Sequence, residues 1–315
     1  MIQTINAIRT EIAKVVVGQE KMIDCLLIGL LCDGHILIEG IPGLAKTTTV
    51  KALSQTLGLG FKRVQFTPDL LPSDILGSEV YDPKNNGFKI KKGPIFTNLL
   101  LADEINRAPA KVQSALLEVM QEHQVTLGDE SFKLQRPFLV LATQNPIENE
   151  GVYPLPEAQL DRFMMKLRVG YNTAEEELSI ARRISSDTSE EIHAVIDSEM
   201  LEKLKERVKG IHIDEEVERY IIALVQATRH PEQVGLNDLK KYIQFGASPR
   251  VSIDLFKACK AVAFLRGREF VTPSDIMSIL KDIMRHRIVL SYEAEAENID
   301  VDTLIEQIVK AVPVP

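Results

Sequence analysis

The sequence predicts an α/β fold in which a parallel-sheet domain is followed by a smaller, all-helical domain. Five short strands alternate with helices in the first half of the chain, and this order is typical of a parallel sheet covered by helices. From Thr173 onward, helix-starting patterns dominate, beginning with a capping box at 173–176. We therefore expect two domains, residues 1–172 and residues 173–315.

The composition is that of a soluble globular chain with an excess of acidic residues. Of its 315 residues, 45% are hydrophobic and 26% are charged, with a formal net charge of −8 and a pI of about 5.4. An acidic balance argues against a surface dominated by contacts with nucleic acid or acidic lipid. A nucleic-acid partner is therefore not expected, although a local basic patch is compatible with this charge.

Nothing in the sequence indicates membrane insertion or export. The longest apolar run, residues 25–32, is much shorter than a bilayer-spanning helix, and charges within the first helix argue against a signal peptide. The cysteines at 25, 32 and 259 lack the spacing of metal ligands. We expect buried thiols in a reducing compartment, and hence a cytoplasmic protein.

Two helices are predicted before the first strand. Residues 3–15 place three isoleucines on one helical face, and residues 20–32 are apolar on most sides. A break between them is formed by Val17, Gly18 and Gln19.

The most specific pattern in the chain is a strand, loop and helix at residues 35–58. The loop is close to Gly-x-x-x-x-Gly-Lys-Thr/Ser, in which small residues let backbone N–H groups surround phosphate oxygens at a helix N-terminus. Lys46 would reach the β- and γ-phosphates of ATP, and the Thr47 hydroxyl would ligate Mg²⁺. The candidate nucleotide-binding residues of the loop are Gly40, Pro42, Gly43, Leu44, Ala45, Lys46, Thr47 and Thr48.

Ala45 departs from this pattern because it stands where a second glycine is expected. Since alanine carries a Cβ, we expect its backbone to avoid positive φ. The alternative interpretation of the whole loop is an ordinary Gly/Pro turn before a helix that begins with lysine.

The remaining elements of the first domain follow from alternating or continuous apolar runs. Asn86-Gly87, flanked by alternating residues, is a hairpin signal. The expected elements are a strand at 61–66, a loop or short helix at 67–77, a hairpin at 79–92, a strand at 98–104, a helix at 110–122, a hairpin at 125–134, a strand at 138–143, a short helix at 155–162 and a last strand at 164–169.

Asp103 and Glu104 form the second functional signal, since they end a buried strand and ligands bind beyond the carboxyl ends of strands in open α/β sheets. Asp103 would hold Mg²⁺ directly or through water. Glu104 would orient and deprotonate the attacking water. The alternative is a strand that merely ends in two solvated acids.

Three polar residues complete the predicted site. Asn145, at the tip of the next strand, has an amide that would hold the hydrolytic water or a γ-phosphate oxygen; otherwise it is a turn residue before Pro146. Arg162 precedes the last strand, and Arg250 lies in the first turn of a helix, where a nearby phosphate would offset its unfavourable interaction with the helix dipole. Either arginine is equally compatible with a surface ion pair.

The order of these motifs resembles that of an AAA+ ATPase, and in detail that of the MoxR family, over nearly the whole chain. In that family's loops an alanine at the position of Ala45 is usual. The segments that carry the resemblance are Val17-Gly18-Gln19, similar to the adenine-side segment; Gly40 to Thr47; Leu100 to Ala108; Ala142 to Pro146; Glu157 to Phe163, similar to the arginine-finger segment; and Gly246 to Arg250, similar to the second sensor.

The resemblance implies a homo-oligomer, a hexameric ring with ATP between protomers. Arg162 would then act on the neighbour's ATP and Arg250 on its own protomer's, while Arg107 is a lower-ranked candidate for facing the neighbour. The hairpins at 79–92 and 122–134 resemble inserts that tend to face the ring pore, although both fit plain surface hairpins equally well.

The resemblance also implies a partner: MoxR-like ATPases act in assembly or maturation of other proteins, often with a partner that carries a von Willebrand factor A domain. Three alternatives stay open at this point. A nucleic-acid motor would use the lysines of the first hairpin, although neither hairpin shows a row of aromatic residues. The motor subunit of a metal chelatase is a second alternative, but the sequence contains no cluster of metal ligands to support it. The third is a nucleotide-dependent assembly module with negligible turnover, against which Glu104 and Arg162 argue. The lysines of the first hairpin are Lys84, Lys89, Lys91 and Lys92.

Overall fold

The computed structural model describes residues 2–84, 86–146, 151–185 and 190–315. At its centre lies a parallel sheet in the strand order β2-β5-β8-β1-β9, which confirms the predicted α/β architecture. The strands are β1 (Ile36–Glu39), β2 (Phe61–Gln65), β5 (Leu99–Asp103), β8 (Leu139–Gln144) and β9 (Met165–Arg168).

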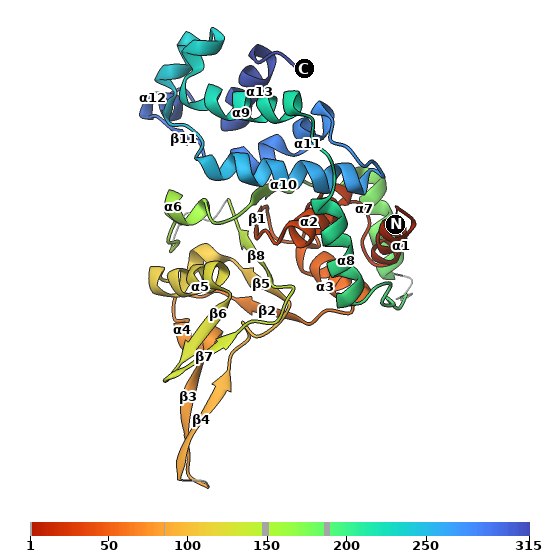
Figure 1. The fold of residues 1–315 in the computed structure, drawn as a ribbon. Helices are drawn as coiled ribbons and strands as arrows, with labels where there is room; N and C mark the ends of the chain where they lie inside the picture. The colour runs from red at the N-terminus through yellow and green to blue at the C-terminus, as the bar shows by residue number, and fades with distance from the viewer. Residues whose placement is uncertain (1, 85, 147–150, 186–189) are drawn as a thin grey trace.

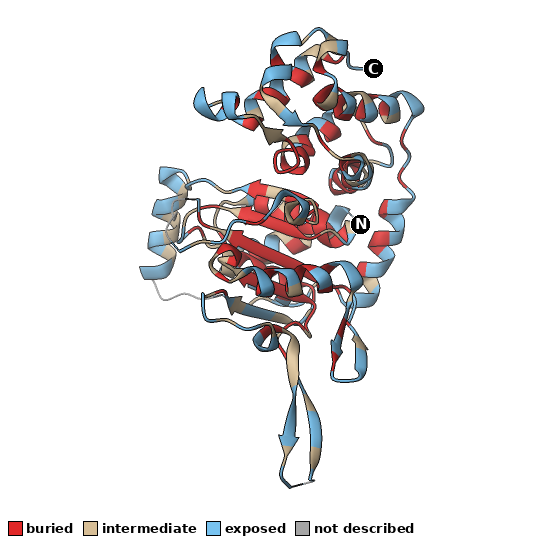
Figure 2. Ribbon diagram, turned by 90° about the vertical axis from the view of Figure 1, so that its left-hand side faces the viewer, coloured by how far each residue is buried: buried red, intermediate tan, exposed pale blue. Residues whose placement is uncertain are grey.

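Both faces of the sheet are buried, because successive apolar residues of each central strand point to opposite sides. In β5, Leu99 and Leu101 pack in one apolar core, while Leu100 and Ala102 pack in another. The first core also contains the helices α1 (Ile2–Ala13), α2 (Glu20–Cys32) and α3 (Lys46–Thr56), and the second contains α5 (Ala110–Glu122). Figure 2 shows the buried strands between these two layers.

Both predicted hairpins are present. The longer one, β3 (Gly77–Asp82) with β4 (Gly87–Lys92), follows the short helix α4 (Pro72–Leu76) and projects away from the body of the molecule (Figure 1). The shorter one pairs β6 (Gln124–Leu127) with β7 (Glu130–Lys133).

Aromatic contacts mark both ends of the longer hairpin. Its strands carry an exposed aromatic pair, Tyr81 and Phe88, with ring centroids 5.5 Å apart, which the sequence analysis did not anticipate. At its base, the Lys92 ammonium lies 5.0 Å from the ring of Phe96 and 4.9 Å from the ring of Phe132, so that the two hairpins are joined by a shared cation–π contact.

The C-terminal part is mainly helical, as expected, and Asp214, Ser248 and Thr272 are the N-caps of three of its helices. It is not all-helical: Ile243 and Phe245 pair with Leu290 and Val289 in a short antiparallel ribbon. The elements are α7 (Ala174–Ser185), α8 (Ser198–Lys209), α9 (Glu215–Arg229), η2 (Pro231–Val234), η3 (Asn237–Lys241), β10 (Ile243–Phe245), α10 (Pro249–Leu265), α11 (Pro273–Met284), β11 (Val289–Leu290), α12 (Tyr292–Ala296) and α13 (Val301–Ala311).

The two parts of the chain share one apolar core. Helix α10 packs on both α2 and α8, and the Arg183 guanidinium of α7 donates to the carbonyl oxygens of Ala13 and Lys14 at the end of α1. The segments before and after residue 172 are therefore in extensive contact, and the boundary there stays a prediction. None of the helices in the described ranges is long and apolar enough to cross a lipid bilayer.

Candidate nucleotide-binding site

A cavity of about 380 Å³ lies at the carboxyl edge of the sheet, between the loop that follows β1 and the ends of β2, β5 and β8. We call it the phosphate cavity. It brings together the whole predicted loop, both acids and Asn145, as the position of these residues at adjacent strand ends requires. Its lining residues are Gly40, Pro42, Gly43, Leu44, Ala45, Lys46, Thr47, Thr48, Arg63, Gln65, Asp103, Glu104, Thr143 and Asn145.

The backbone of the loop corrects one prediction. Ala45 has φ 53° and ψ 19° and is the N-cap of α3, so it adopts the left-handed conformation that we expected its Cβ to exclude. This conformation costs a residue with a Cβ about 1–2 kcal/mol. The loop has to reverse at that point in order to enter α3, whose first turn is held by Thr49, which donates from both its N–H and its hydroxyl to the Ala45 carbonyl. Burial of Val50 and Leu53 of α3 in the core offsets the strain.

Lys46 is half-buried at the first position of α3. Its ammonium donates to the carbonyl oxygen of Gly40, 2.6 Å away, and so spans the loop from end to end. Burial lowers the pKa of Lys46 from its usual value, although the nearby carboxylates of Asp103 and Glu104 oppose the shift. A partly desolvated ammonium gains more than a solvated one from meeting phosphate oxygens.

Asp103, the last residue of β5, is held from both neighbouring strands. The Arg63 guanidinium of β2 lies 2.6 Å from its Oδ2, and the Thr143 hydroxyl of β8 donates to its Oδ1 at 2.6 Å. This carboxylate is fixed in direction and still faces the phosphate cavity.

Glu104 follows with a left-handed backbone, φ 57°, which turns the chain sharply out of β5. Its N–H donates to the Thr143 hydroxyl at 2.8 Å, so one threonine contacts both acids. Its Oε2 accepts from the Gln65 amide at 2.8 Å and from the Arg107 guanidinium at 3.1 Å. Strained backbone of this kind clusters at functional sites, which agrees with the role predicted for Glu104.

The sequence analysis missed three residues of the phosphate cavity: Arg63, Gln65 and Thr143. The signal for the first two was present, because residues two apart on a strand share a face. In the register of the sheet, Gln65 lies beside Asp103, and Arg63 is one step earlier on the same face. The sequence does not show that β2 is the strand next to β5, because strand order depends on contacts between residues distant in sequence.

Arg162 and Arg250 lie away from the phosphate cavity and share a second cavity of about 340 Å³, which we call the arginine cavity. Arg250 stays close to the segment of Arg162, because its guanidinium approaches the Asp161 carbonyl at 3.4 Å. The residues that line the arginine cavity are Asp33, Gly34, His35, Met120, Gln121, His123, Arg162, Met164, Arg250, Ile253, Asp254 and Lys257.

Comparison with known proteins gives this arrangement a family. Residues 35–165 match the profile described as "ATPase family associated with various cellular activities (AAA)", and residues 237–308 match "AAA lid domain". The protein named Chaperone MoxR1 from Mycobacterium tuberculosis is 45% identical over 314 residues, which are 100% of this chain and 83% of that protein. The chain belongs to the MoxR family of AAA+ ATPases.

Two further comparisons agree with this assignment. An uncharacterized protein from Bacillus subtilis, YeaC, is 44% identical over 96% of this chain and 92% of its own length. A crystal structure provisionally named as an ATPase, from Cytophaga hutchinsonii, superposes with a TM-score of 0.95 at 50% identity, covering 100% of this chain and 96% of that one. The fold therefore agrees with the order of the motifs: the chain has the sheet and the lid that are expected of a MoxR-type AAA+ ATPase.

The segment that resembles the family's adenine side lies outside the phosphate cavity. Gln19 donates from its amide to Asn172 Oδ1 at 2.7 Å, and the Asn172 amide donates to the Val17 carbonyl at 3.2 Å. Gly18 has φ 71°, and a Cβ there would lie 2.7 Å from Glu176 Oε1. Gln19 lines a cavity of about 210 Å³ together with residues 167–172 and Glu176, so this small recess lies where the end of β9 leads into α7.

The chemistry of the predicted metal ligands fits Mg²⁺. Thr47 offers a hydroxyl and Asp103 a carboxylate, both lining the phosphate cavity, and Mg²⁺ prefers oxygen ligands with substrate phosphates completing its shell. Among the described residues there is no group of three or more His, Cys, Asp or Glu that could hold a metal alone.

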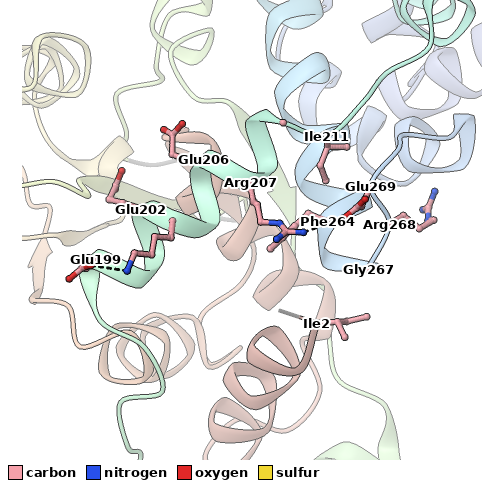
Figure 3. Close-up of a pocket in the computed structure, with 12 residues that line it drawn as sticks. Ile2, Glu199, Glu202, Glu206, Arg207, Ile211, Phe264, Gly267, Arg268 and Glu269 are labelled. Carbon is pink, nitrogen blue, oxygen red and sulfur yellow. Dashed lines mark hydrogen bonds and ion pairs between the residues drawn. The ribbon is translucent and has the colours of Figure 1, made fainter.

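A larger cavity, of about 960 Å³, lies between α8 and the end of α10 and does not suit a phosphate group (Figure 3). Three glutamates of α8 line it, at positions 199, 202 and 206. Two of its cations are paired with acids: Lys203 with Glu199 at 2.7 Å and Arg207 with Glu269 at 3.1 Å. Size alone therefore does not identify the nucleotide site.

Proposed function

We propose that this chain binds Mg-ATP in the phosphate cavity, hydrolyses it to ADP and phosphate, and uses the cycle to remodel a protein partner. The observation that supports this most strongly is the convergence of Lys46, Asp103, Glu104 and Asn145 on a single cavity at the carboxyl edge of the sheet. Lys46 follows the loop after β1, Asp103 and Glu104 end β5, and Asn145 follows β8, so segments far apart in the sequence meet at one cavity.

Each residue has a role that its contacts support. The Lys46 ammonium transfers from the Gly40 carbonyl to the β- and γ-phosphates. Thr47 and Asp103 would hold Mg²⁺, which would neutralise charge at the phosphates when bound. Glu104 accepts the proton of the attacking water after its carboxylate parts from Gln65 and Arg107, and Asn145 holds that water or a γ-phosphate oxygen.

The arginines complete the site from a neighbouring protomer. Arg162 and Arg250 share the arginine cavity and neither lines the phosphate cavity of its own protomer. We therefore place both on a neighbour's nucleotide, whereas the resemblance assigned Arg250 to its own protomer. Arg107 stays on its own Glu104 in this state. A closed ring, of six protomers in the family pattern, brings every arginine cavity to a phosphate cavity.

The class of partner is proposed from the name of a relative and has its own test. The relative from M. tuberculosis is named a chaperone, which favours a protein partner, here in the cytoplasm and by family pattern one with a von Willebrand factor A domain. Glu104→Gln protein loaded with ATP should retain such a partner, while Lys46→Ala protein should not. Equal retention by both variants would contradict nucleotide-dependent engagement.

One observation favours a nucleic-acid motor as the second candidate. The exposed aromatic pair Tyr81 and Phe88 lies on the same hairpin as three lysines, at positions 84, 89 and 91. Proteins that bind single-stranded nucleic acid combine aromatic and basic side chains in this way. Binding to single-stranded DNA that weakens steeply with salt would support it, since phosphate contacts release counterions.

The catalytic proposal is tested by phosphate release from ATP with and without Mg²⁺. Wild-type protein should be active only with the metal, and Lys46→Ala should lose ATP binding because the β/γ charge then lacks its main cation. Nucleotide affinity of the wild-type strength in Lys46→Ala would disprove the assignment of the loop.

A further inference from the structure

The backbone on either side of Arg162 is held by two buried side chains that follow α11. The Arg287 guanidinium donates through Nη2 to the carbonyl oxygens of Asp161, at 3.0 Å, and Phe163, at 2.9 Å. His286 Nε2 lies 2.8 Å from the same Phe163 carbonyl and, because a carbonyl only accepts, carries the hydrogen. Arg287 and His286 are 6% and 7% exposed. The carbonyl oxygens of the two residues on either side of Arg162, Asp161 and Phe163, are thus held from the lid.

The charge of Arg287 is balanced within the same cluster. Its Nη2 donates to Asp254 Oδ2 of α10 at 2.6 Å, and its Nε lies 2.9 Å from Asp161 Oδ1. Burial raises the pKa of Asp254, while the Arg287 guanidinium opposes the shift. Nη2 shares its two hydrogens among the carbonyls of Asp161 and Phe163 and Asp254, while Nε contacts Asp161 as an ion pair. Lysine offers a single nitrogen in place of this fork, so it is not an equivalent residue here.

Helix α10 reaches the same segment from its first turn. The Ser248 hydroxyl donates to Asp161 Oδ1 at 3.1 Å, and Arg250 lies 3.8 Å from Asp161 Oδ2. Asp161, the residue before Arg162, is therefore contacted by both the start of α10 and the segment after α11. The lid and the Arg162 segment are joined through charged and polar contacts rather than through apolar packing alone.

We propose that Arg287, assisted by His286, is a positioning residue for Arg162: it fixes the two carbonyls beside Arg162 so that the direction of this side chain follows the lid. The inference rests on the proposed role of Arg162 at a neighbour's ATP. A rotation of the lid would then change the aim of the arginine presented to the next protomer, which links the state of one protomer to hydrolysis in another.

The test uses mixtures in which each protomer supplies only half of a site. Lys46→Ala protomers supply Arg162 and no phosphate cavity, while Arg162→Ala protomers supply the cavity and no finger. Arg287→Lys, which keeps the charge opposite Asp254 but loses the planar fork, is added to one partner at a time. In the Lys46→Ala partner it should lower the rescued kcat by about 10²-fold, the loss expected when a catalytic group is displaced by about 1 Å. In the Arg162→Ala partner it should leave kcat close to that of the parent mixture.

The matched control is Arg285→Lys. Arg285 is equally buried and donates to the Lys166 carbonyl and to Asp282 and Asp302, but to neither carbonyl beside Arg162. It should lower thermal stability and affect both mixtures alike.

The possible failures are distinguishable. Equal losses from Arg287→Lys in both partners, or no loss in either, would overturn the positioning role while leaving the trans-acting arginine intact. Absence of rescue in the parent mixture of Lys46→Ala with Arg162→Ala would overturn the proposed role of Arg162, and this inference with it.

Discussion

The phosphate cavity and the arginine cavity differ in the groups that they contain, and in the proposed ring they would form opposite halves of one site. The first contains a loop for phosphates and two carboxylates for metal and water, and among its lining residues Lys46 and Arg63 are the cations, both engaged by groups of the same protomer. The second contains Arg162, Arg250 and Lys257, and its lining includes no glycine-rich phosphate loop. If the proposed roles are right, the comparison teaches that a protomer carries every required group and still needs a neighbour to complete a site.

The largest expected effect comes from removing an arginine of the arginine cavity. Arg162→Ala should bind ATP normally, but its turnover should fall by a factor of about 10³–10⁵, because an arginine finger supplied in trans stabilises charge only in the transition state. Turnover and nucleotide affinity, measured separately, check this.

Mixing is the control for that prediction. Arg162→Ala and Lys46→Ala should each be inactive alone and regain activity together, with a maximum at intermediate ratios. Wild-type activity per molecule should also rise with protein concentration. Activity that stays flat down to a monomeric concentration, without rescue on mixing, would show that each protomer is complete by itself.

The next largest effect comes from removing the proposed base of the phosphate cavity. Glu104→Gln keeps the shape and hydrogen bonding of the side chain but removes the base, so turnover should fall by about 10²–10⁴ while ATP binding and assembly persist. Single-turnover hydrolysis is the measurement. If hydrolysis were unchanged, the base would have to be sought elsewhere in the phosphate cavity.

The smallest effect concerns the charge of the arginine cavity. His35 donates from Nε2 to the Met120 carbonyl and accepts from the Val140 N–H, both at 3.0 Å, and burial lowers the pKa of His35 to about 4. In the unfolded chain this histidine takes up its proton near pH 6.5. The contribution of neutral His35 to the free energy of unfolding is therefore fully present above that pH, and roughly 3 kcal/mol is lost as the pH falls toward 4.

Denaturation of wild type and His35→Gln between pH 4 and 8 tests this. The variant should show a shallower loss of unfolding free energy on the acid side, while the pH profile of turnover above pH 7 should be the same for both. A change in the turnover profile instead would mean that His35 titrates within the working cavity.

Local sequence predicted much of this molecule. The strands of the sheet were readable because their apolar runs are short and bounded, and the phosphate loop was readable because its residue types have few other uses. The errors have a common cause in tertiary context. Ala45 takes a left-handed conformation that its own Cβ disfavours, and the ribbon that pairs Ile243 with Leu290 joins residues far apart in the chain. The same holds for the arginines: Arg162 and Arg250 were identified by motif, but the cavity that they share depends on how the lid packs on the sheet.

The contact of Lys92 with Phe96 and Phe132 has a mechanical consequence. It secures the long hairpin at its base, whereas Tyr81 and Phe88 lie farther along the two strands. A six-residue strand at about 3.3 Å per residue reaches roughly 20 Å, so a tilt of about 10° at the base moves the far end by roughly 3–4 Å. A small rearrangement beside the sheet would therefore be amplified along the hairpin if it pivots at Lys92.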